Sequence, residues 1–464
     1  MRPVTFLFGI HNHQPVGNFD WVIEEAYQKA YRPFLDRLEA HPGVKVALHN
    51  SGILLDWFGK HHPEYLERVG SLVAAAQVEP ITGGYYEPIL PVIPDADKTG
   101  QIRRMSEWID AHWGKRPTGL WLAERVWEPS LAVPIAEAGV RWLMVDDAHF
   151  LAAGAEPERL WNWWLTEDQG TTLGVWPISK ALRYLIPFEP PEKTIEFLRN
   201  LAAGGADRVA FLADDGEKFG VWPDTFERVY TNGWLEKFFC LLEANADWLK
   251  MELPGAVTAT RAPAGRIYLP TASYSEMMEW ALPTPVQKEF HRVRERLEQA
   301  RAPEAGFVRG GFWRNFLARY PESNLMHKRM LDARQRLDAN GFSNETRALV
   351  LDDVWQAQCN CAYWHGVFGG LYLPHLREGV YRRILSAEAR LDESGSAGLP
   401  FLRVEHSDLD RDGHDEIRMV NRGVGVIVSP FRGGAIESMD YYPRLRNLSH
   451  GLTRRPEAYH EALR

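Results

Sequence analysis

The chain has 464 residues and a formal net charge of −9, so it is long enough for two or three domains. Its Lys and Arg residues are dispersed without the basic stripe that nucleic-acid binding needs, and no apolar run reaches the length of a membrane span. The presence of only three cysteines, and the lack of a secretory pattern at the N-terminus, favour a reducing, cytoplasmic location.

Short apolar runs that end in polar residues recur through the first part of the chain. They lie at residues 4–10, 44–48, 78–82, 119–122, 142–145, 172–177, 209–212 and 267–269. Longer amphipathic stretches, such as 21–40 and 95–112, separate them. Apolar strands that alternate with helices indicate βαβ units, and seven or eight such units predict a closed or nearly closed barrel. In such barrels the active site lies at the carboxyl ends of the strands.

The character of the sequence changes twice after the last of these runs. Charged helical patterns at 287–301 and 324–340 predict a helical segment packed on the barrel. Short β-like runs at 416–421 and 425–429 then predict the start of a β domain that this chain does not complete. Residues 408–416, DLDRDGHDE, begin like an EF-hand loop, but Met419 stands at the closing position, so we predict a turn.

Carboxylates follow two of the predicted strands. Glu124 comes after the strand at 119–122 with Arg125 beside it, and the strand at 209–212 leads into Asp214, Asp215 and Glu217. A carboxylate beside an arginine stays ionised, which suits a nucleophile, whereas one crowded by like charges has a raised pKa, which suits an acid. Retaining glycoside cleavage requires such a pair, although strand-end caps and salt bridges would account for each motif equally well.

His11 and His13 end the first predicted strand. Residues i and i+2 of a strand point to the same side, so both imidazoles can enter one pocket. That pocket could bind a sugar, hold a metal ion with Asp147 or His149 as third ligand, or be purely structural. The content of 18 Trp and 16 Tyr fits either a large core or a sugar site, because aromatic faces cover the apolar faces of sugar rings.

Seven longer motifs are spaced through the chain. They are HNHQP (11–15), VEPITGGYYEP (78–88), WLAERVWEP (121–129), DDGEKFGVWP (214–223), YLPTASYSEMMEWALP (268–283), FWRNFLARYPESNLMHKRML (312–331) and QCNCAYWHGVFGGLYLPHLR (358–377). In this order they resemble glycoside hydrolase family 57, in its α-amylase and 4-α-glucanotransferase branch. The resemblance implies a distorted, TIM-like (β/α)7 barrel, a helical segment and the start of a truncated C-terminal β-sandwich. We expect these three domains at 1–282, 283–390 and 396–464.

The resemblance also implies a chemistry. It is retaining cleavage or transfer on α-1,4-glucans such as starch, glycogen or maltodextrin, through a covalent glycosyl-enzyme intermediate and without a metal or other cofactor. Glu124 would be the nucleophile and Asp215 the general acid/base. The expected substrate contacts are His11, His13, Glu79, Trp121, Asp214, Glu217, Trp222, Cys361 and Trp364. Cys361 stands where the family commonly has Asp, and because a thiol is a weak hydrogen-bond partner we expect a weaker subsite there.

Two other functions stay open. The first is a metal-dependent barrel hydrolase, a deacetylase or zinc mannosidase-like enzyme, that would use His11 and His13 as ligands. The second is a non-catalytic glucan-binding protein. The choice between hydrolysis and transfer depends on how the acceptor subsites exclude water, and for the assembly a homodimer is one candidate.

Overall fold

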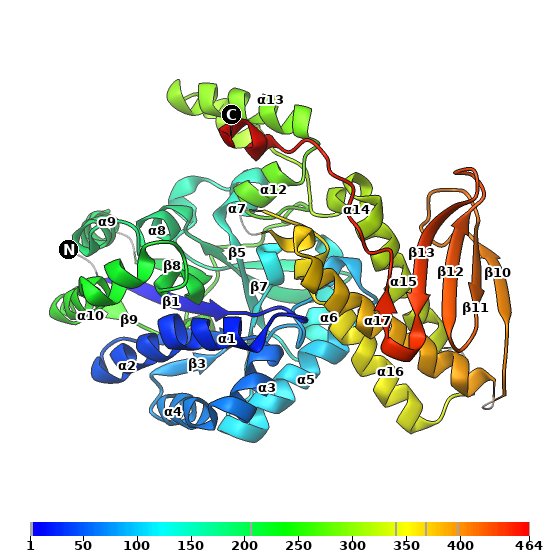
Figure 1. Ribbon diagram of the computed structural model, residues 1–464. Helices are drawn as coiled ribbons and strands as arrows, with labels where there is room; N and C mark the ends of the chain where they lie inside the picture. The colour runs from blue at the N-terminus through cyan, green and yellow to red at the C-terminus, as the bar shows by residue number, and fades with distance from the viewer. Residues whose placement is uncertain (1–2, 205–206, 339–340, 367–368, 397–398, 464) are drawn as a thin grey trace. The chain divides into compact units, whose positions relative to one another are not determined.

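The computed structural model describes residues 3–204, 207–338, 341–366, 369–396 and 399–463 (Figure 1). The chain divides into two compact units. We call the first, Met1–Gln14, Phe19–Met278 and Ala300–Arg309, the barrel unit, and the second, Pro15–Asn18, Glu279–Gln299 and Gly310–Arg464, the C-terminal unit. The predicted division into three domains stays a prediction. Among the described residues, no helix combines the length and the apolar character that crossing a bilayer requires.

Seven described strands of the barrel unit run parallel around its core. They are β1 (Val4–Asn12), β2 (Val46–Asn50), β3 (Val78–Pro80), β4 (Gly119–Trp121), β5 (Trp142–Asp146), β7 (Thr171–Ile178) and β8 (Arg208–Asp215). Parallel pairing joins β3, β2, β1 and β8 in one sheet and β4, β5 and β7 in another. A Thr82–Leu120 bridge joins the two sheets on one side, and Ser179 N donates to Phe211 O at 2.8 Å on the other. The structure is therefore the predicted TIM-like (β/α)7 barrel.

Two further strands differ from the expected pattern. β6 (Trp164–Asp168) pairs antiparallel with β7, and β9 (Leu249–Met251) pairs with the first residues of β1. The strand predicted at 267–269 is wrong: this segment follows the edge of β6 as a loop, with one bridge from Arg266 to Leu165. Pro270, which lacks a backbone N–H, follows this run directly and cannot extend a ladder of hydrogen bonds.

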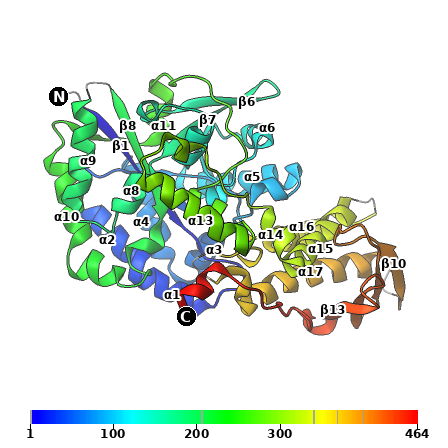
Figure 2. The ribbon, with the colours of Figure 1, turned by 90° about the horizontal axis from the view of Figure 1, so that it is seen from above.

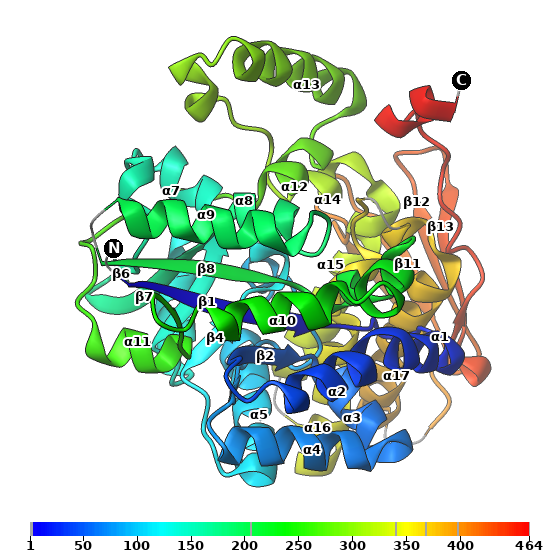
Figure 3. The ribbon, with the colours of Figure 1, turned by 90° about the vertical axis from the view of Figure 1, so that its left-hand side faces the viewer.

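Helices surround the strands of the barrel unit. Figure 3 shows α2, α4, α9 and α10 outside β1, β2 and β8. The stretch predicted at 21–40 is one helical run of three parts, α1 (Asp20–Ala26), the π-turn η1 (Tyr27–Tyr31) and α2 (Arg32–Ala40). The other helices of more than one turn are α3 (Gly52–His61), α4 (Pro63–Ala74), α5 (Asp95–Trp113), α6 (Ala132–Glu137), α7 (Asp147–Ala152), α8 (Lys180–Leu185), α9 (Pro191–Ala203), α10 (Trp234–Ala244), α11 (Pro254–Thr260) and α12 (Ser275–Trp280).

Alternate residues of β1 face two different cores. Phe6, Phe8 and Ile10 belong to the outer cluster, which the surrounding helices complete. Leu7 belongs to the inner cluster, inside the ring of strands. Because side chains of a strand alternate between its faces, the side chain of His11 falls on the inner face, at the carboxyl end. The same alternation places the last residues of the neighbouring strands around it.

The C-terminal unit combines helices with an antiparallel sheet. Its helices are α13 (Thr284–Gln299), α14 (Asn315–Arg319), α15 (Pro321–Asp338), α16 (Asn344–Ala357) and α17 (Pro374–Gly395). Its strands, in spatial order, are β10 (Arg403–Ser407), β11 (Glu416–Val420), β12 (Val424–Ser429), β13 (Ala435–Tyr441) and β14 (Arg446–Asn447). Figure 2 shows α15, α16 and α17 beside this sheet.

Most expectations for this part of the chain are confirmed. The helices predicted at 287–301 and 324–340 correspond to α13 and α15, although residues 339 and 340 lie outside the described residues. The predicted turn at 408–416 joins β10 to β11. There the carboxylates of Asp408 and Asp410 accept hydrogen bonds from the backbone N–H of Asp412 at 3.0 and 3.1 Å.

Candidate active site

Glu124 lies directly after β4, on a backbone conformation that few residues adopt. Its φ is +51° and that of Arg125 is +50°, both in the left-handed region. Such a conformation costs about 1–3 kcal/mol per residue and persists where the surroundings enforce it. Here Ser273 Oγ donates to Glu124 O at 2.5 Å, and His149 Nε2 lies 3.0 Å from Arg125 O. The strained turn places the Glu124 side chain at the carboxyl end of the strands.

Some neighbours of Glu124 raise the pKa of its carboxyl and others lower it. Tyr274 donates a hydrogen bond to Glu124 Oε2 at 2.7 Å, and the guanidinium of Arg125 lies 4.2 Å from the centroid of the Tyr274 ring. Burial and the negative charge of Asp215 raise the pKa of Glu124, against the lowering effects of Arg125 and Tyr274. Asp215 therefore lies close enough for its negative charge to oppose the ionisation of Glu124.

Two adjacent carboxyls at the end of β8 have opposite tendencies. Asp214 contacts Lys218 and lies 3.4 Å from Arg183 Nε. Although burial alone would raise its pKa, these cations hold the pKa of Asp214 well below its usual range. Burial and the ionised Asp214 raise the pKa of Asp215. Asp214 thus stays charged, and Asp215 keeps its proton more readily than an exposed carboxyl does.

A group of buried imidazoles and an indole lies at the end of β1. His11 Nδ1 is 2.8 Å from His49 Nδ1, and His11 Nε2 is 3.4 Å from Glu87 Oε1. The His11 ring stacks on the indole of Trp121, with 4.3 Å between centroids. Burial, followed by the nearby His49 and His13, lowers the pKa of His11. His11 is therefore a neutral imidazole, which can donate at one nitrogen and accept at the other.

Glu217 joins the same end of the barrel through the backbone of β1. Its Oε1 accepts a hydrogen bond from His13 N at 3.0 Å and another from Tyr31 OH at 2.5 Å. Burial and the charge of Asp215 raise the pKa of Glu217 to about 7. Glu217 is brought to the predicted group, and these hydrogen bonds fix the loop that carries His13.

Trp222 lies close to the group around Asp214, whereas Glu79 lies away from the group around Glu124. Trp222 is half-buried on the loop after β8, and its ring centroid is 5.0 Å from the Nζ of Lys218, which also contacts Asp214. Glu79 is not brought to the group around Glu124. Its Oε2 accepts a hydrogen bond from Gly255 N at 2.8 Å, at the start of α11, and burial raises its pKa to about 7. This contact joins Glu79 to the first turn of α11, and its expected sugar contact stays a prediction.

The structure does not assemble the metal site that the sequence suggested. His149 has both ring nitrogens within 3.0 Å of backbone carbonyls, and Asp147 Oδ2 accepts a hydrogen bond from Lys180 N at 2.8 Å. His149 therefore has no ring nitrogen left for a metal, and one of the two carboxylate oxygens of Asp147 is engaged by the backbone. His11, His49 and Glu87 do bring one ligand atom each within 4.8 Å of one another. The hydrogen-bond distance between the two Nδ1 atoms shows how these imidazoles are engaged instead.

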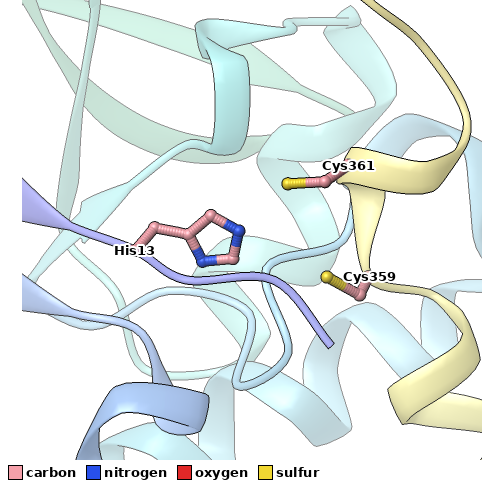
Figure 4. Close-up of side chains that lie close together, drawn as sticks. All are labelled: His13, Cys359 and Cys361. Atoms are coloured by element: carbon pink, nitrogen blue, oxygen red, sulfur yellow. The ribbon is translucent and has the colours of Figure 1, made fainter. Parts of the chain in front are cut away.

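Two predicted substrate contacts belong to the C-terminal unit. The thiols of Cys359 and Cys361 project to the same side of the segment after α16, within 4.8 Å of one another (Figure 4). Trp364 Nε1 donates to Asn360 Oδ1 at 2.7 Å, and its ring lies 6.4 Å from that of Trp280. The substrate contacts of Cys361 and Trp364 stay predictions.

Sequence reasoning missed four residues that shape this site. They are His49, Glu87, Arg183 and Tyr274. His49 ends an apolar strand as His11 does, so the same strand-end rule could have found it. Glu87 and Tyr274 stand inside motifs quoted for the family resemblance, but nothing in their local pattern says which way their side chains point.

A model of the Glycosyl hydrolase family 57 matches residues 7–270, more than half of the chain. The chain belongs to glycosyl hydrolase family 57. The models of the middle and C-terminal domains of α-amylase/4-α-glucanotransferase match residues 311–391 and 408–464 of this family 57 enzyme.

Named relatives extend the match over the full chain. The enzyme is 46% identical to an α-amylase 1 from Dictyoglomus thermophilum, over all of this chain and 67% of that protein. It is 44% identical to a 4-α-glucanotransferase from Thermococcus kodakarensis, over 99% of this chain and 68% of that one. The crystal structure of the 4-α-glucanotransferase from Thermococcus litoralis superimposes with a TM-score of 0.92 at 43% identity, over all of this chain and 70% of that one. This likeness confirms the fold inferred from the sequence.

Proposed function

We propose that this family 57 enzyme cleaves α-1,4-linked glucans with retention of configuration and passes the glycosyl group to water or to a second glucan. Retention requires two carboxyl groups with different protonation at one site, a nucleophile and a general acid. Support comes from the unequal environments of Glu124 and Asp215, and from relatives that are named as α-amylases and 4-α-glucanotransferases.

The proposal rests on the charged and hydrogen-bonding groups that surround Glu124 and Asp215. Burial and Asp215 raise the pKa of Glu124, and the Arg125 charge and the Tyr274 hydrogen bond oppose this rise and favour the ionised form that a nucleophile needs. Burial and the ionised Asp214 favour a protonated Asp215, which a general acid must be. Burial raises the pKa of both carboxyls, so the two roles follow from the neighbours of each: Arg125 and Tyr274 beside Glu124, and the ionised Asp214 beside Asp215.

The reaction then has two steps. Glu124 attacks the anomeric carbon while Asp215 protonates the leaving oxygen, and a covalent glycosyl-enzyme forms. Asp215, now a carboxylate, removes the proton of the incoming water or sugar hydroxyl, which displaces Glu124. The neutral His11, the Trp121 face, His13, Trp222 and the charged Asp214 would bind sugar hydroxyls and ring faces around the point of cleavage, with Glu217 fixing the His13 loop.

The nucleophile role is tested by Glu124→Gln, with the exposed carboxyl Glu107→Gln on α5 as matched control. We expect turnover of maltotriose to fall by roughly 10⁴-fold or more in the first variant and to stay unchanged in the second. Glu124→Gln with activity near that of the native enzyme would reject the assignment.

The acid/base role needs a substrate that does not depend on protonation. Asp215→Asn should be inactive on maltotriose but should still form the glycosyl-enzyme from an α-maltosyl fluoride, whose leaving group needs no proton. Added azide should then give an α-configured maltosyl azide, detected by NMR. Equal inactivity on both substrates would contradict the role of Asp215.

Incubation of the native enzyme with maltotriose separates transfer from hydrolysis. A ladder of longer oligosaccharides together with glucose indicates transfer, and maltose with glucose alone indicates hydrolysis. Activity that survives prolonged chelation would exclude the metal-dependent alternative, and any turnover would exclude the non-catalytic one. A cytoplasmic location and a homodimer remain predictions, which cell fractionation and sedimentation would test.

A further inference from the structure

A second cluster of ligating side chains lies on the outside of the barrel unit, where the end of α2 meets α10 (Figure 3). His41 directly follows α2. Glu236, Cys240 and Glu243 lie four and then three residues apart on α10, so they share one face of that helix. Ligand atoms of His41, Glu236 and Cys240 all lie within 4.8 Å of one another.

The imidazole of His41 is held in one orientation. Its Nδ1 is 2.9 Å from Glu243 Oε2, and Glu243 is itself fixed by a hydrogen bond from Gly43 N at 3.0 Å. The ring meets the face of Phe239 edge-on, with 5.5 Å between centroids. In a neutral imidazole, the carboxylate of Glu243 favours the tautomer with the proton on Nδ1, and Nε2 then carries a lone pair.

That Nε2 atom is buried and makes no hydrogen bond, although His41 is only 6% exposed. It lies 3.3 Å from Glu236 Oε1. A buried lone pair that faces a carboxylate is unfavourable unless a cation or a proton lies between them. The cluster therefore places an unsatisfied acceptor beside the Glu236 carboxylate and the Cys240 thiol, which donates to Glu236 Oε1 at 3.9 Å. Burial and the charges of Glu236 and Glu243 raise the pKa of Cys240, so a cation bound here would displace the thiol proton.

We propose that His41 Nε2, the Glu236 carboxylate and the Cys240 thiolate bind a zinc ion that clips the end of α2 to α10. Imidazole nitrogen, thiolate and carboxylate are the donors of protein zinc sites, and water completes the fourth position. Ligating histidines donate their other ring N–H to a carboxylate, as His41 does to Glu243. A thiolate and an imidazole disfavour calcium and magnesium, which select oxygen ligands.

The surroundings allow such an ion to enter. Cys240 is exposed, so a hydrated ion can reach the thiol from solvent. Arg37 Nη1 lies 3.4 Å from Glu236 Oε2, on the oxygen that does not face His41. Both partners of this pair are nearly half exposed, so the pair contributes little to stability. Zinc at Oε1 would leave Oε2 to Arg37.

The test uses tag-free protein and zinc alone, in competition with a chromogenic chelator, with Co²⁺ as a spectroscopic probe. We expect one site per chain and a thiolate-to-Co²⁺ charge-transfer band. Cys240→Ser should abolish the band and weaken zinc binding by more than 10-fold. Cys361→Ser is the matched control for the remaining thiols and should leave both unchanged.

A second variant tests the orienting carboxylate. Glu243→Gln should keep the charge-transfer band but weaken zinc binding about 10- to 100-fold, because the ligand set is intact and only its support is lost. Zinc should also raise the melting temperature of the native protein and not that of Cys240→Ser. The proposal fails if the native protein binds no zinc, if the band persists in Cys240→Ser, or if it disappears in Cys361→Ser.

Discussion

The barrel and the C-terminal sheet both bury charged side chains, but they do so in different places. Within the barrel, the strand interiors are apolar apart from Glu79 on β3, and other charges gather at the carboxyl ends, as Glu124 and Asp215 do. In the C-terminal sheet, Arg418 and Asp440 lie along the buried face. The opposite face exposes the apolar side chains Val404, Met419, Val424, Ile436 and Tyr441. The buried face also carries apolar residues such as Val420 and Ile427, so this sheet lacks the usual separation of an apolar buried face from a polar exposed one.

The difference lies in how completely the charges are paired. Arg329 of α15 binds Glu388 of α17 at 2.8 Å and Asp440 of β13 at 2.9 Å. Although burial alone would raise it, Arg329 and Arg418 lower the pKa of Glu388 to about 2. In the barrel, by contrast, the pKa values of Glu124 and Asp215 are raised. Fully paired buried charges serve packing, whereas unevenly paired ones are available for chemistry.

The strongest test of this contrast is to remove the central cation of the C-terminal network. Arg329→Met should destabilise the protein by about 3–5 kcal/mol, because Glu388 and Asp440 would remain buried without it. Arg382→Met is the matched control: Arg382 makes an exposed i,i+4 pair with Glu378 and should cost about 0.5 kcal/mol or less. Urea unfolding of both variants measures the difference. Equal costs would mean that the network contributes no more than a surface ion pair.

Glu79 tests the link between pairing and pKa inside the barrel, since its burial outweighs the lowering effects of the Gly255 N–H and the Lys115 charge. Its folded pKa of about 7 exceeds the unfolded value, so the native state holds the proton more tightly. Stability should therefore fall as the pH rises from about 4.5 to 7, by roughly 3 kcal/mol in total.

Glu79→Gln should remove this fall, because the amide oxygen can still accept from Gly255 N but never ionises. The variant should match the native enzyme at pH 4 and exceed it in stability at pH 8, whereas Glu107→Gln should follow the native curve. Denaturant unfolding across this pH range provides the measurement. An unchanged pH dependence combined with a loss of kcat/KM would support the expectation of a sugar contact.

Much of the barrel could be predicted because its strands are buried on both faces and therefore read as continuous apolar runs. The polar residue that stops each run marks the carboxyl end, which located His11, Glu124 and Asp215 correctly. Glu79 interrupts such a run instead of ending it. Its contact depends on Gly255, which is 176 residues away, and no local pattern carries that information.

Other features were beyond the sequence for similar reasons. Tyr274 reaches Glu124 across 150 residues, from a loop where a strand was expected at 267–269. The turn at Glu124 has a left-handed backbone conformation but contains no glycine, so the sequence does not predict it. In β12 the alternation of Val424, Val426 and Val428 shows that one face is apolar, but not that this face lies away from the helices. The charged partners on α15 and α17 decide which face of the sheet packs against these helices.

Tyr274 offers a smaller effect on activity. Tyr274→Phe removes the hydrogen bond to Glu124 Oε2, and because bonds to charged groups contribute about 1.5–3 kcal/mol, kcat/KM should fall roughly 10- to 100-fold. The same bond lowers the pKa of Glu124, so its loss should move the acid limb of the pH profile to higher pH. Tyr268→Phe, an exposed tyrosine that donates to Glu167, is the control and should change neither quantity. A lower rate with an unmoved acid limb would mean that Tyr274 acts on packing alone.

The smallest effect is expected on the apolar face of the C-terminal sheet, where two isoleucines on neighbouring strands can be compared directly. Ile436 of β13 is 55% exposed and Ile427 of β12 is 1% exposed, on opposite faces. Ile436→Thr should change the free energy of unfolding by about 0.5 kcal/mol or less, because little apolar surface leaves or enters water. Ile427→Thr should cost about 2–3 kcal/mol, since it removes packed methyl groups and buries a hydroxyl. A cost for Ile436→Thr as large as that for Ile427→Thr would show that the apolar face is covered in solution.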